Sequence, residues 1–397
     1  MRIDQINNIT NKCTGCMACV DVCPMNCVAQ VIGQDGFLYS AIEESKCINC
    51  GKCGSVCPLE IKNKNVDLQR LYATYSIVSG GQNRGSSGGI FELLAEHFLN
   101  KGYYVCGAAF DEKMQLKHQI VHTQETLSPL LKSKYIQSDM KGVYKQIKTL
   151  LEKDEKVFFC GTPCQVSALK NSLNTSLIGN LFTADIICHG VPSQKMFDGY
   201  LQSLGKEHGG KIEDFRFRVK DNKYKHAHGY SYKFKRNTVD VVKNGVYTQS
   251  SFYNAFKNYL MFRDGCYDCQ YATLQRVSDI TLGDFWGIEK YDFKGNTDKG
   301  VSMIITNTTK GEDAFLGIVD KTVYKEFPIE YGIKSNHCLT NTTKKPEKRD
   351  AIIATFAKEG YESTAKKYFS GGKSLKYRLY WLIPSWLRNM LRKLRGN

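Results

Sequence analysis

The sequence has no long apolar run and no signal-like stretch at its N-terminus. Within its 397 residues, no run of 18 or more apolar residues occurs, so no membrane-spanning helix is expected. No apolar segment follows the first residues, so secretion is not indicated. We therefore expect a cytoplasmic protein whose sixteen cysteines stay reduced instead of forming a disulfide scaffold.

Motifs for two common classes of partner are also missing. The net charge is +16, but no helix-turn-helix, zinc finger or RNA-binding signature accompanies it, so nucleic acid is not an expected partner. No G-x-G-x-x-G stands between a predicted strand and a predicted helix, so the sequence offers no nicotinamide site. Much of the charge lies at the C-terminal end, where residues 366–397 contain nine Lys or Arg and no acid.

Cysteine is abundant, and eight cysteines form two matching runs near the N-terminus. Each run has the spacing C-x2-C-x2-C-x3-C-P. In a two-cluster ferredoxin, the first three cysteines of a run bind one [4Fe-4S] cube and the fourth reaches the other cube. The predicted ligand sets are Cys13, Cys16, Cys19 and Cys57 for one cluster, and Cys47, Cys50, Cys53 and Cys23 for its partner. Zinc also binds four thiolates, but its sites usually lack the third close cysteine and the Cys-Pro end.

The rest of the chain predicts a large α/β domain, with a mixed sheet and flanking helices, behind a small α+β ferredoxin-like domain. A polar stretch between Pro58 and Leu71 is typical of a linker. We expect a ferredoxin domain over residues 1–64, a large domain over 65–345 and a basic helical tail over 346–397.

Apolar periodicity in the large domain alternates between that of helices and that of strands. The expected helices cover residues 91–98 and 143–151, and the expected strands cover 103–110, 157–160 and 181–187. Alternating aromatic residues between 215 and 247 predict antiparallel strands inserted in the same sheet.

Four further cysteines, Cys164, Cys188, Cys266 and Cys269, lie in expected loops. Loops that follow strands are where α/β sheets place their chemistry. By residue type alone, these cysteines could form a zinc knuckle, a redox-active dithiol between Cys160 and Cys164, or simply buried thiols.

Five motifs in this order resemble the beta subunit of coenzyme F420 hydrogenase/dehydrogenase. They are Arg84-Gly85-Ser86-Ser87-Gly88-Gly89, Ser133-Lys134-Tyr135-Ile136-Gln137-Ser138, Gly161-Thr162-Pro163-Cys164-Gln165, Cys266-x2-Cys269 and Ser278-Asp279-Ile280-Thr281-Leu282-Gly283-Asp284. The resemblance covers roughly residues 65–340, and several relatives carry a ferredoxin at the N-terminus. It implies a flavin domain that holds FAD beside a [4Fe-4S] cluster of its own. The implied ligands of this third cluster are Cys164, Cys188, Cys266 and Cys269, and the leftover thiols, expected to be inert, are Cys27, Cys106, Cys160 and Cys338.

The resemblance also implies that FAD lies at a glycine and serine turn formed by Ser86, Ser87, Gly88 and Gly89. The turn runs into an expected helix, so backbone N–H groups and the helix dipole could receive the flavin pyrophosphate. By itself this stretch would favour an ordinary serine N-cap.

Four more residues complete the implied flavin site. Lys132, Lys134 and Tyr135 would add charge and a stacking or hydroxyl contact to the flavin. Asp284 would line the flavin or substrate pocket, together with Trp286, although a core position suits Trp286 equally well. No catalytic residue is assigned.

The expected function is that of an iron–sulfur flavoprotein oxidoreductase. Electrons would pass between ferredoxin-type clusters and FAD, and FAD would exchange hydride with a coenzyme F420-like deazaflavin or another small molecule. The expected electron partner is a ferredoxin or another redox protein. Two alternatives stay open: an electron-relay subunit without substrate chemistry, and a thiol-redox or zinc module behind the ferredoxin.

The C-terminal tail shows an amphipathic pattern from Leu375 to Leu394, broken by Pro384. Its basic face and two tryptophans suit peripheral contact with an anionic membrane, which would place the protein at the inner face of that membrane. Docking onto the protein's own core or onto a partner explains the pattern equally well.

Overall fold

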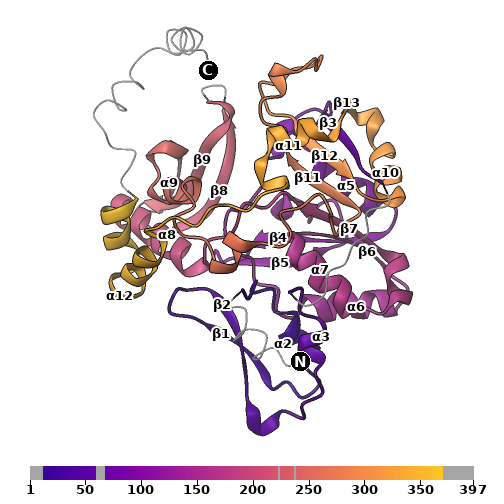
Figure 1. Cartoon of the computed structure of the whole chain (residues 1–397). Helices are drawn as coiled ribbons and strands as arrows, with labels where there is room; N and C mark the ends of the chain where they lie inside the picture. The colour runs from indigo at the N-terminus through magenta and orange to yellow at the C-terminus, as the bar shows by residue number, and fades with distance from the viewer. Residues whose placement is uncertain (1–11, 60–67, 222–223, 237, 370–397) are drawn as a thin grey trace, which may run out of the picture.

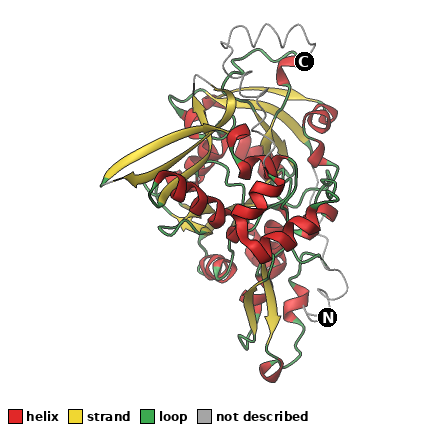
Figure 2. Ribbon diagram, turned by 90° about the vertical axis from the view of Figure 1, so that its left-hand side faces the viewer, coloured by secondary structure: helices red, strands yellow, loops and turns green. Residues whose placement is uncertain are grey.

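The computed structural model describes residues 12–59, 68–221, 224–236 and 238–369. A small module, formed by residues 12–59, lies against one side of a larger body (Figure 1). Figure 2, turned by 90°, shows the two-stranded hairpin of this module extending below the larger body. The structure is mixed α/β, with a large mixed sheet and helices, as expected.

The small module consists of an antiparallel hairpin and two short helices, one for each cysteine run. The hairpin pairs β1 (Val28–Ile32) with β2 (Leu38–Ile42). Helix α2 (Ala18–Val22) carries Cys19, and α3 (Lys52–Ser55) carries the corresponding cysteine of the second run. Each cysteine run therefore contains one short helix.

The larger body is built on a mixed sheet of eight strands in the order β13-β3-β12-β11-β7-β6-β4-β5. The four strands β11, β7, β6 and β4 are parallel to their neighbours within this group, and the outer strands pair antiparallel. The strands are β3 (Arg70–Ser76), β4 (Tyr103–Phe110), β5 (Leu116–Val121), β6 (Lys156–Gly161), β7 (Leu181–Ile186), β11 (Ile280–Asp284), β12 (Ser302–Thr306) and β13 (Thr322–Phe327). The expected strands over 103–110, 157–160 and 181–187 are thereby confirmed.

Helices cover both faces of this sheet, as burial of its parallel strands requires. On one face, α5 (Ile90–Asn100) and α10 (Thr309–Leu316) pack into an apolar core around Phe158 and Phe182. On the other face lie α6 (Val143–Glu152) and α7 (Pro163–Ser172), which share an apolar core with the cysteine-bearing module. The helices expected over 91–98 and 143–151 are confirmed.

The aromatic strands between residues 212 and 246 form a separate sheet, so the expectation that they insert into the main sheet is wrong. Strands β8 (Ile212–Asp221), β9 (Tyr224–Arg236) and β10 (Val239–Val246) pair only with one another, in the order β10-β9-β8. Phe215 and Phe217 on β8 belong to a second apolar core. Three helices pack against the aromatic face of this three-stranded sheet and bury it in a core of its own. The strands are therefore stabilised without joining the main sheet. The helices are α8 (Gln194–His208), α9 (Ser251–Lys257) and α12 (Arg349–Tyr368).

The remaining elements are short. Two further helices are α4 (Gly81–Arg84) and α11 (Ile329–Ser335). The 3-10 turns are η1 (Glu44–Lys46), η2 (Ser128–Leu130), η3 (Thr175–Asn180), η4 (Tyr247–Gln249), η5 (Asp264–Asp268), η6 (Ile288–Lys290), η7 (Val319–Lys321) and η8 (His337–Leu339).

The first part of the expected tail is a packed helix. Ile352, Phe356 and Tyr361 of α12 are buried in the second apolar core. Within the described ranges no helix is long and apolar enough to cross a membrane. The amphipathic segment from Leu375 to Leu394 lies outside the described residues.

Candidate functional site

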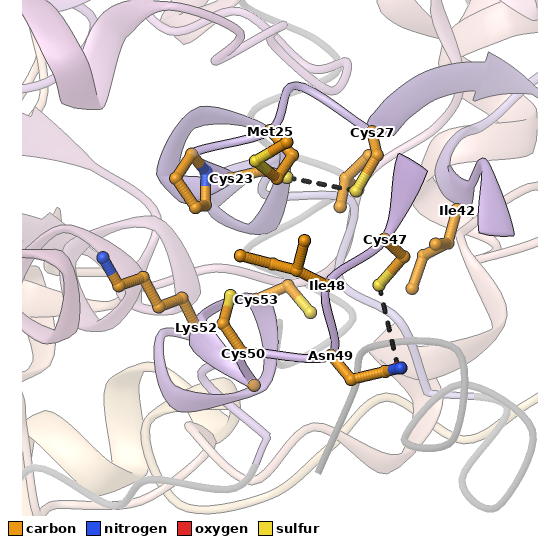
Figure 3. Close-up of a pocket in the computed structure, with 13 residues that line it drawn as sticks. Cys23, Met25, Cys27, Ile42, Cys47, Ile48, Asn49, Cys50, Lys52 and Cys53 are labelled. Atoms are coloured by element: carbon orange, nitrogen blue, oxygen red, sulfur yellow. Dashed lines mark hydrogen bonds between the residues drawn. The ribbon is translucent and has the colours of Figure 1, made fainter. Parts of the chain in front are cut away.

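One cavity of the small module is lined by cysteines from both runs. Cys23 of the first run faces Cys47, Cys50 and Cys53 of the second run, and we call these four the outer set (Figure 3). The crossed pattern is the one that a two-cluster ferredoxin uses to bind one cube. Cys27 also lines this cavity, with its Sγ atom 3.4 Å from that of Cys23.

The outer set reaches the surface of the molecule. Cys50 is exposed, and the apolar side chains of Met25 and Ile48 at the same cavity are 45% and 61% exposed. A group bound in this cavity would therefore be accessible to a docking redox partner.

The other four cysteines of the module, Cys13, Cys16, Cys19 and Cys57, form an inner set. Cys16, Cys19 and Cys57 are buried, and Cys13 is half-buried. Burial raises the pKa of Cys19, and the thiols of Cys16, Cys13 and Cys57 raise it further. Cys16, Cys19 and Cys57 also belong to one apolar core.

The large domain brings together Cys164, Cys188, Cys266 and Cys269, which we call the third set. Cys164 lies in the first turn of α7, directly after β6, and Cys188 follows β7. Burial raises the pKa of Cys164, and the thiols of Cys269 and Cys188 act in the same direction. Burial likewise raises the pKa of Cys188, together with Cys266 and Cys269. The structure thus gathers four cysteines that lie as much as 105 positions apart in the sequence.

Two of the leftover thiols differ in their position relative to the third set. Cys338 is buried and interacts electrostatically with Cys188 and Cys269, so it is a fifth thiol in that neighbourhood. Cys160 is next to Phe159 on β6 but packs on the opposite face of the sheet, against the α5 core. In the part of the chain that the structure describes, no three Cys, His, Asp or Glu side chains converge closely enough to hold a single metal ion.

The inner set and the third set meet in one apolar core. Cys16 and Cys19 belong to this core, and Cys164 and Cys269 pack against it. The thiol of Cys16 also raises the pKa of Cys164. The two sets are therefore neighbours across the boundary between the small module and the large domain.

Arg263 fixes the small module to the large domain. Its side chain is 1% exposed and donates hydrogen bonds to the carbonyl oxygens of Cys13 (2.9 Å) and Leu38. Its guanidinium carbon lies 4.8 Å from the ring centroid of Phe37 and 4.6 Å from that of Tyr39. This arginine stands three positions before Cys266 in the sequence, so it links the loop of the third set to the backbone of the inner set.

Two further contacts hold the same boundary. The carboxylate of Asp21 accepts hydrogen bonds from the backbone N–H groups of Gly142 (2.7 Å) and Tyr144 (3.1 Å) at the start of α6. The side chain of Gln30 donates to Asp139 at 3.1 Å. An acceptor from the small module thus caps a helix of the large domain.

The turn expected to receive flavin phosphate runs into α5, as predicted, but its serines do not cap that helix. The residue at the N-cap is Gly89, with a φ of 85°. Ser86 accepts a hydrogen bond from the Ser133 backbone N–H (2.6 Å), and Ser87 donates to the Val301 carbonyl oxygen (2.9 Å). The serine N-cap interpretation is therefore wrong.

Gly88 allows this turn to approach the sheet closely. A Cβ atom added there would lie 2.4 Å from the carbonyl oxygen of Thr74. The backbone N–H of Gly88 donates to the Ser302 hydroxyl at 2.8 Å. Its position between strands β3 and β12 requires a glycine whether or not a phosphate binds nearby.

Strand β8 of the second sheet forms the wall opposite this turn. The Lys220 amine donates to the carbonyl oxygens of Gln82 and Ser87. Arg218 forms a 2.7 Å ion pair with Asp284, and its guanidinium carbon lies 5.6 Å from the ring centroid of Trp286, which is 42% exposed.

Sequence reasoning missed both of these cations. Phe215 and Phe217 alternate with Arg216, Arg218 and Lys220 along β8. The two-residue period of a strand places alternate side chains on opposite faces, so the charged face could have been identified from the sequence. The sequence could not show which element this charged face contacts.

The two lysines expected at the flavin site, and Tyr135 beside them, lie in the loop before α6. Lys132 donates to the carbonyl oxygen of Arg218 at 3.3 Å, while Lys134 donates to those of Pro129 (2.9 Å) and Leu131 (2.7 Å). The ring of Tyr135 packs against aromatic rings of the second core, those of Phe217, Tyr253 and Phe256.

Cations gather where these elements meet. Burial and the nearby Arg218 guanidinium lower the pKa of Lys220 to about 7, and burial lowers that of Lys134 to about 7. Burial and neighbouring arginines also lower the pKa of Lys132. Neighbouring cations in this group repel one another. Because an anionic ligand such as a pyrophosphate would offset that repulsion, the group is a suitable environment for it.

Comparison with known protein families covers two parts of the chain. Residues 154–331 match the family defined by the C terminus of the coenzyme F420 hydrogenase/dehydrogenase beta subunit, and residues 12–61 match the 4Fe-4S dicluster domain. Through residues 154–331, the chain is related to the coenzyme F420 hydrogenase/dehydrogenase beta subunit. Together with the N-terminal dicluster domain, this relationship indicates an iron–sulfur redox protein.

Among solved structures, this chain is similar to a chain of the xenon-derivatised F420-reducing NiFe hydrogenase complex from Methanosarcina barkeri. The sequence identity is 18%, the TM-score is 0.42, and the alignment covers 77% of this chain and 91% of that chain. No curated protein matches the sequence.

Proposed function

We propose that the chain is an iron–sulfur flavoprotein oxidoreductase with three [4Fe-4S] clusters and one FAD. Electrons pass between a redox partner protein and the outer set, then through the inner set and the third set to the flavin. FAD exchanges hydride with a small molecule, for which the family name suggests a coenzyme F420-like deazaflavin. When bound, FAD would convert single electrons into electron pairs.

The observation that carries this proposal is that cysteines of all three sets belong to one apolar core or pack against it. Within this arrangement, Cys50 of the outer set is exposed, whereas Cys16, Cys19 and Cys57 of the inner set are buried. The resulting arrangement supports a route from a surface entry point to the interior of the large domain.

The FAD part of the proposal rests on the cations gathered beside the turn at Ser86 and Ser87. Lys220 and Lys132 would neutralise the pyrophosphate, beside the turn that contains Ser86 and Ser87. Arg218, held by Asp284, would add to this positive charge, and the exposed ring of Trp286 offers an apolar face to a planar ligand. These side chains would bind and orient the flavin, whereas no side chain is assigned to hydride transfer.

Anaerobic purification with joint determination of iron and flavin tests the proposal. The expected content is about twelve irons per chain, because each cube carries about four, together with about one FAD. About eight irons would eliminate the third cluster. Absence of flavin from protein that retains all its iron would eliminate the FAD site.

A second candidate is an electron-relay subunit that hands electrons to a larger complex and performs no substrate chemistry. The family description as a beta subunit favours it. Both candidates share the clusters, so the isolated chain should be assayed for reduction of a deazaflavin with reduced ferredoxin as donor. Turnover by the isolated chain would eliminate the relay candidate.

A further inference from the structure

One buried hydroxyl at the boundary between the inner set and the third set has no hydrogen-bond partner. Tyr144 lies in the first turn of α6, and its side chain is 2% exposed. Its backbone N–H donates to Asp21 of the small module. Among the described residues, nothing accepts a hydrogen bond from its hydroxyl group. A buried polar group without a partner is unusual, and its partner is then an ordered water or a bound group.

The surroundings of this hydroxyl identify that group. Tyr144 shares its apolar core with Cys16 and Cys19 of the inner set, and Cys164 of the third set packs against the same core. The thiols of Cys16, Cys164 and Cys19 all interact electrostatically with this phenol. A tyrosine phenol is protonated at neutral pH without any shift of its pKa, so its O–H is available as a hydrogen-bond donor.

We propose that the Tyr144 hydroxyl donates a hydrogen bond to a sulfur of the cluster bound by the inner set, and thereby raises the reduction potential of that cluster. The inference rests on the cluster assignment of the proposed function. A hydrogen bond to a cluster sulfur stabilises the more negative, reduced state, which makes the potential less negative. Because Tyr144 belongs to the large domain, the inner cluster acquires this donor only when the small module is docked.

Tyr271 provides a matched control. It is buried in the same core, with 8% exposure, and interacts electrostatically with Cys164 and Cys16. Its hydroxyl already donates to the carbonyl oxygen of Pro58 at 2.8 Å. Removing that hydroxyl should therefore leave the cluster potentials unchanged.

The test is a redox titration of the anaerobically purified holoprotein, followed by EPR spectroscopy. Tyr144→Phe should shift one cluster to a more negative potential and leave the others in place, while Tyr271→Phe should shift none. In wild-type protein exchanged into D2O, pulsed EPR of the shifted cluster should show a deuteron coupling that Tyr144→Phe lacks and Tyr271→Phe retains. The same potential shift should persist in a Cys266→Ser background, in which the third cluster is removed.

A second variant keeps the hydroxyl and reverses the expected sign. A fluorinated tyrosine at position 144 is a stronger donor, so it should shift the same cluster to a less negative potential. Unchanged potentials in both position-144 variants would overturn the proposal, and so would a shift that disappears with the third cluster. Low iron in the wild-type protein would instead count against the proposed function.

Discussion

Replacement of Arg263 by methionine should separate the small module from the large domain without unfolding either part. The arginine donates hydrogen bonds to the backbone oxygens of Cys13 and Leu38 and to the Gln137 side-chain oxygen, the last at 3.1 Å. Methionine has a similar length but no donor. The substitution therefore keeps much of the packing and removes the polar contacts.

The size of the effect follows from these contacts. Each buried acceptor left without a donor costs about 1–3 kcal/mol, so the three together cost about 3–9 kcal/mol. Loss of the guanidinium from its place beside Phe37 and Tyr39 adds about 0.5–2 kcal/mol. A cost of this size is a large fraction of the stability of a typical domain, about 5–15 kcal/mol, so the docked state should open measurably.

Hydrogen exchange followed by mass spectrometry can detect this opening. In Arg263→Met, peptides from residues 13–19 and 137–144 should exchange faster than in the wild type, while peptides from the main sheet should not change. The control is Arg216→Met, which removes an exposed ion pair with Asp214 that contributes about 0–1 kcal/mol. Equal protection of the boundary peptides in both variants would refute the reasoning.

Three further predictions concern the cofactors and the tail. Cys266→Ser should lose about four of about twelve irons, because the ferredoxin ligands lie on other residues; retention of all iron would show that Cys266 is not a ligand. Burial lowers the pKa of Lys220 to about 7 in the free protein. We expect Lys220 to stay charged when FAD is bound. FAD affinity should therefore fall by up to about tenfold per pH unit above 7, and equilibrium titration of Lys220→Met should show a flatter profile; an equally steep profile would contradict this role. A chain ending at Phe369 lacks seven Lys or Arg, each contributing ~1 kcal/mol near an anionic surface; it should keep its iron and lose salt-sensitive binding to anionic vesicles, and unchanged binding would contradict the membrane interpretation.

The sequence by itself determined the features that depend on local spacing. The two cysteine runs predict crossed ligand sets, and the outer cavity contains Cys23 together with Cys47, Cys50 and Cys53. Helices α5 and α6 and strands β4, β6 and β7 follow from apolar periodicity, because side-chain direction along a helix or strand is fixed by the local backbone geometry.

Only the tertiary structure decided which surfaces meet. Periodicity shows that β8 has an aromatic and a charged face, but it does not show that the strand joins a separate sheet or that Lys220 faces the turn at Ser87. In the same way, nothing local to Arg263 or Tyr144 indicates a contact with the cysteine-bearing module. These contacts join residues more than 100 positions apart, so they depend on how the cores pack and not on the order of neighbouring residues.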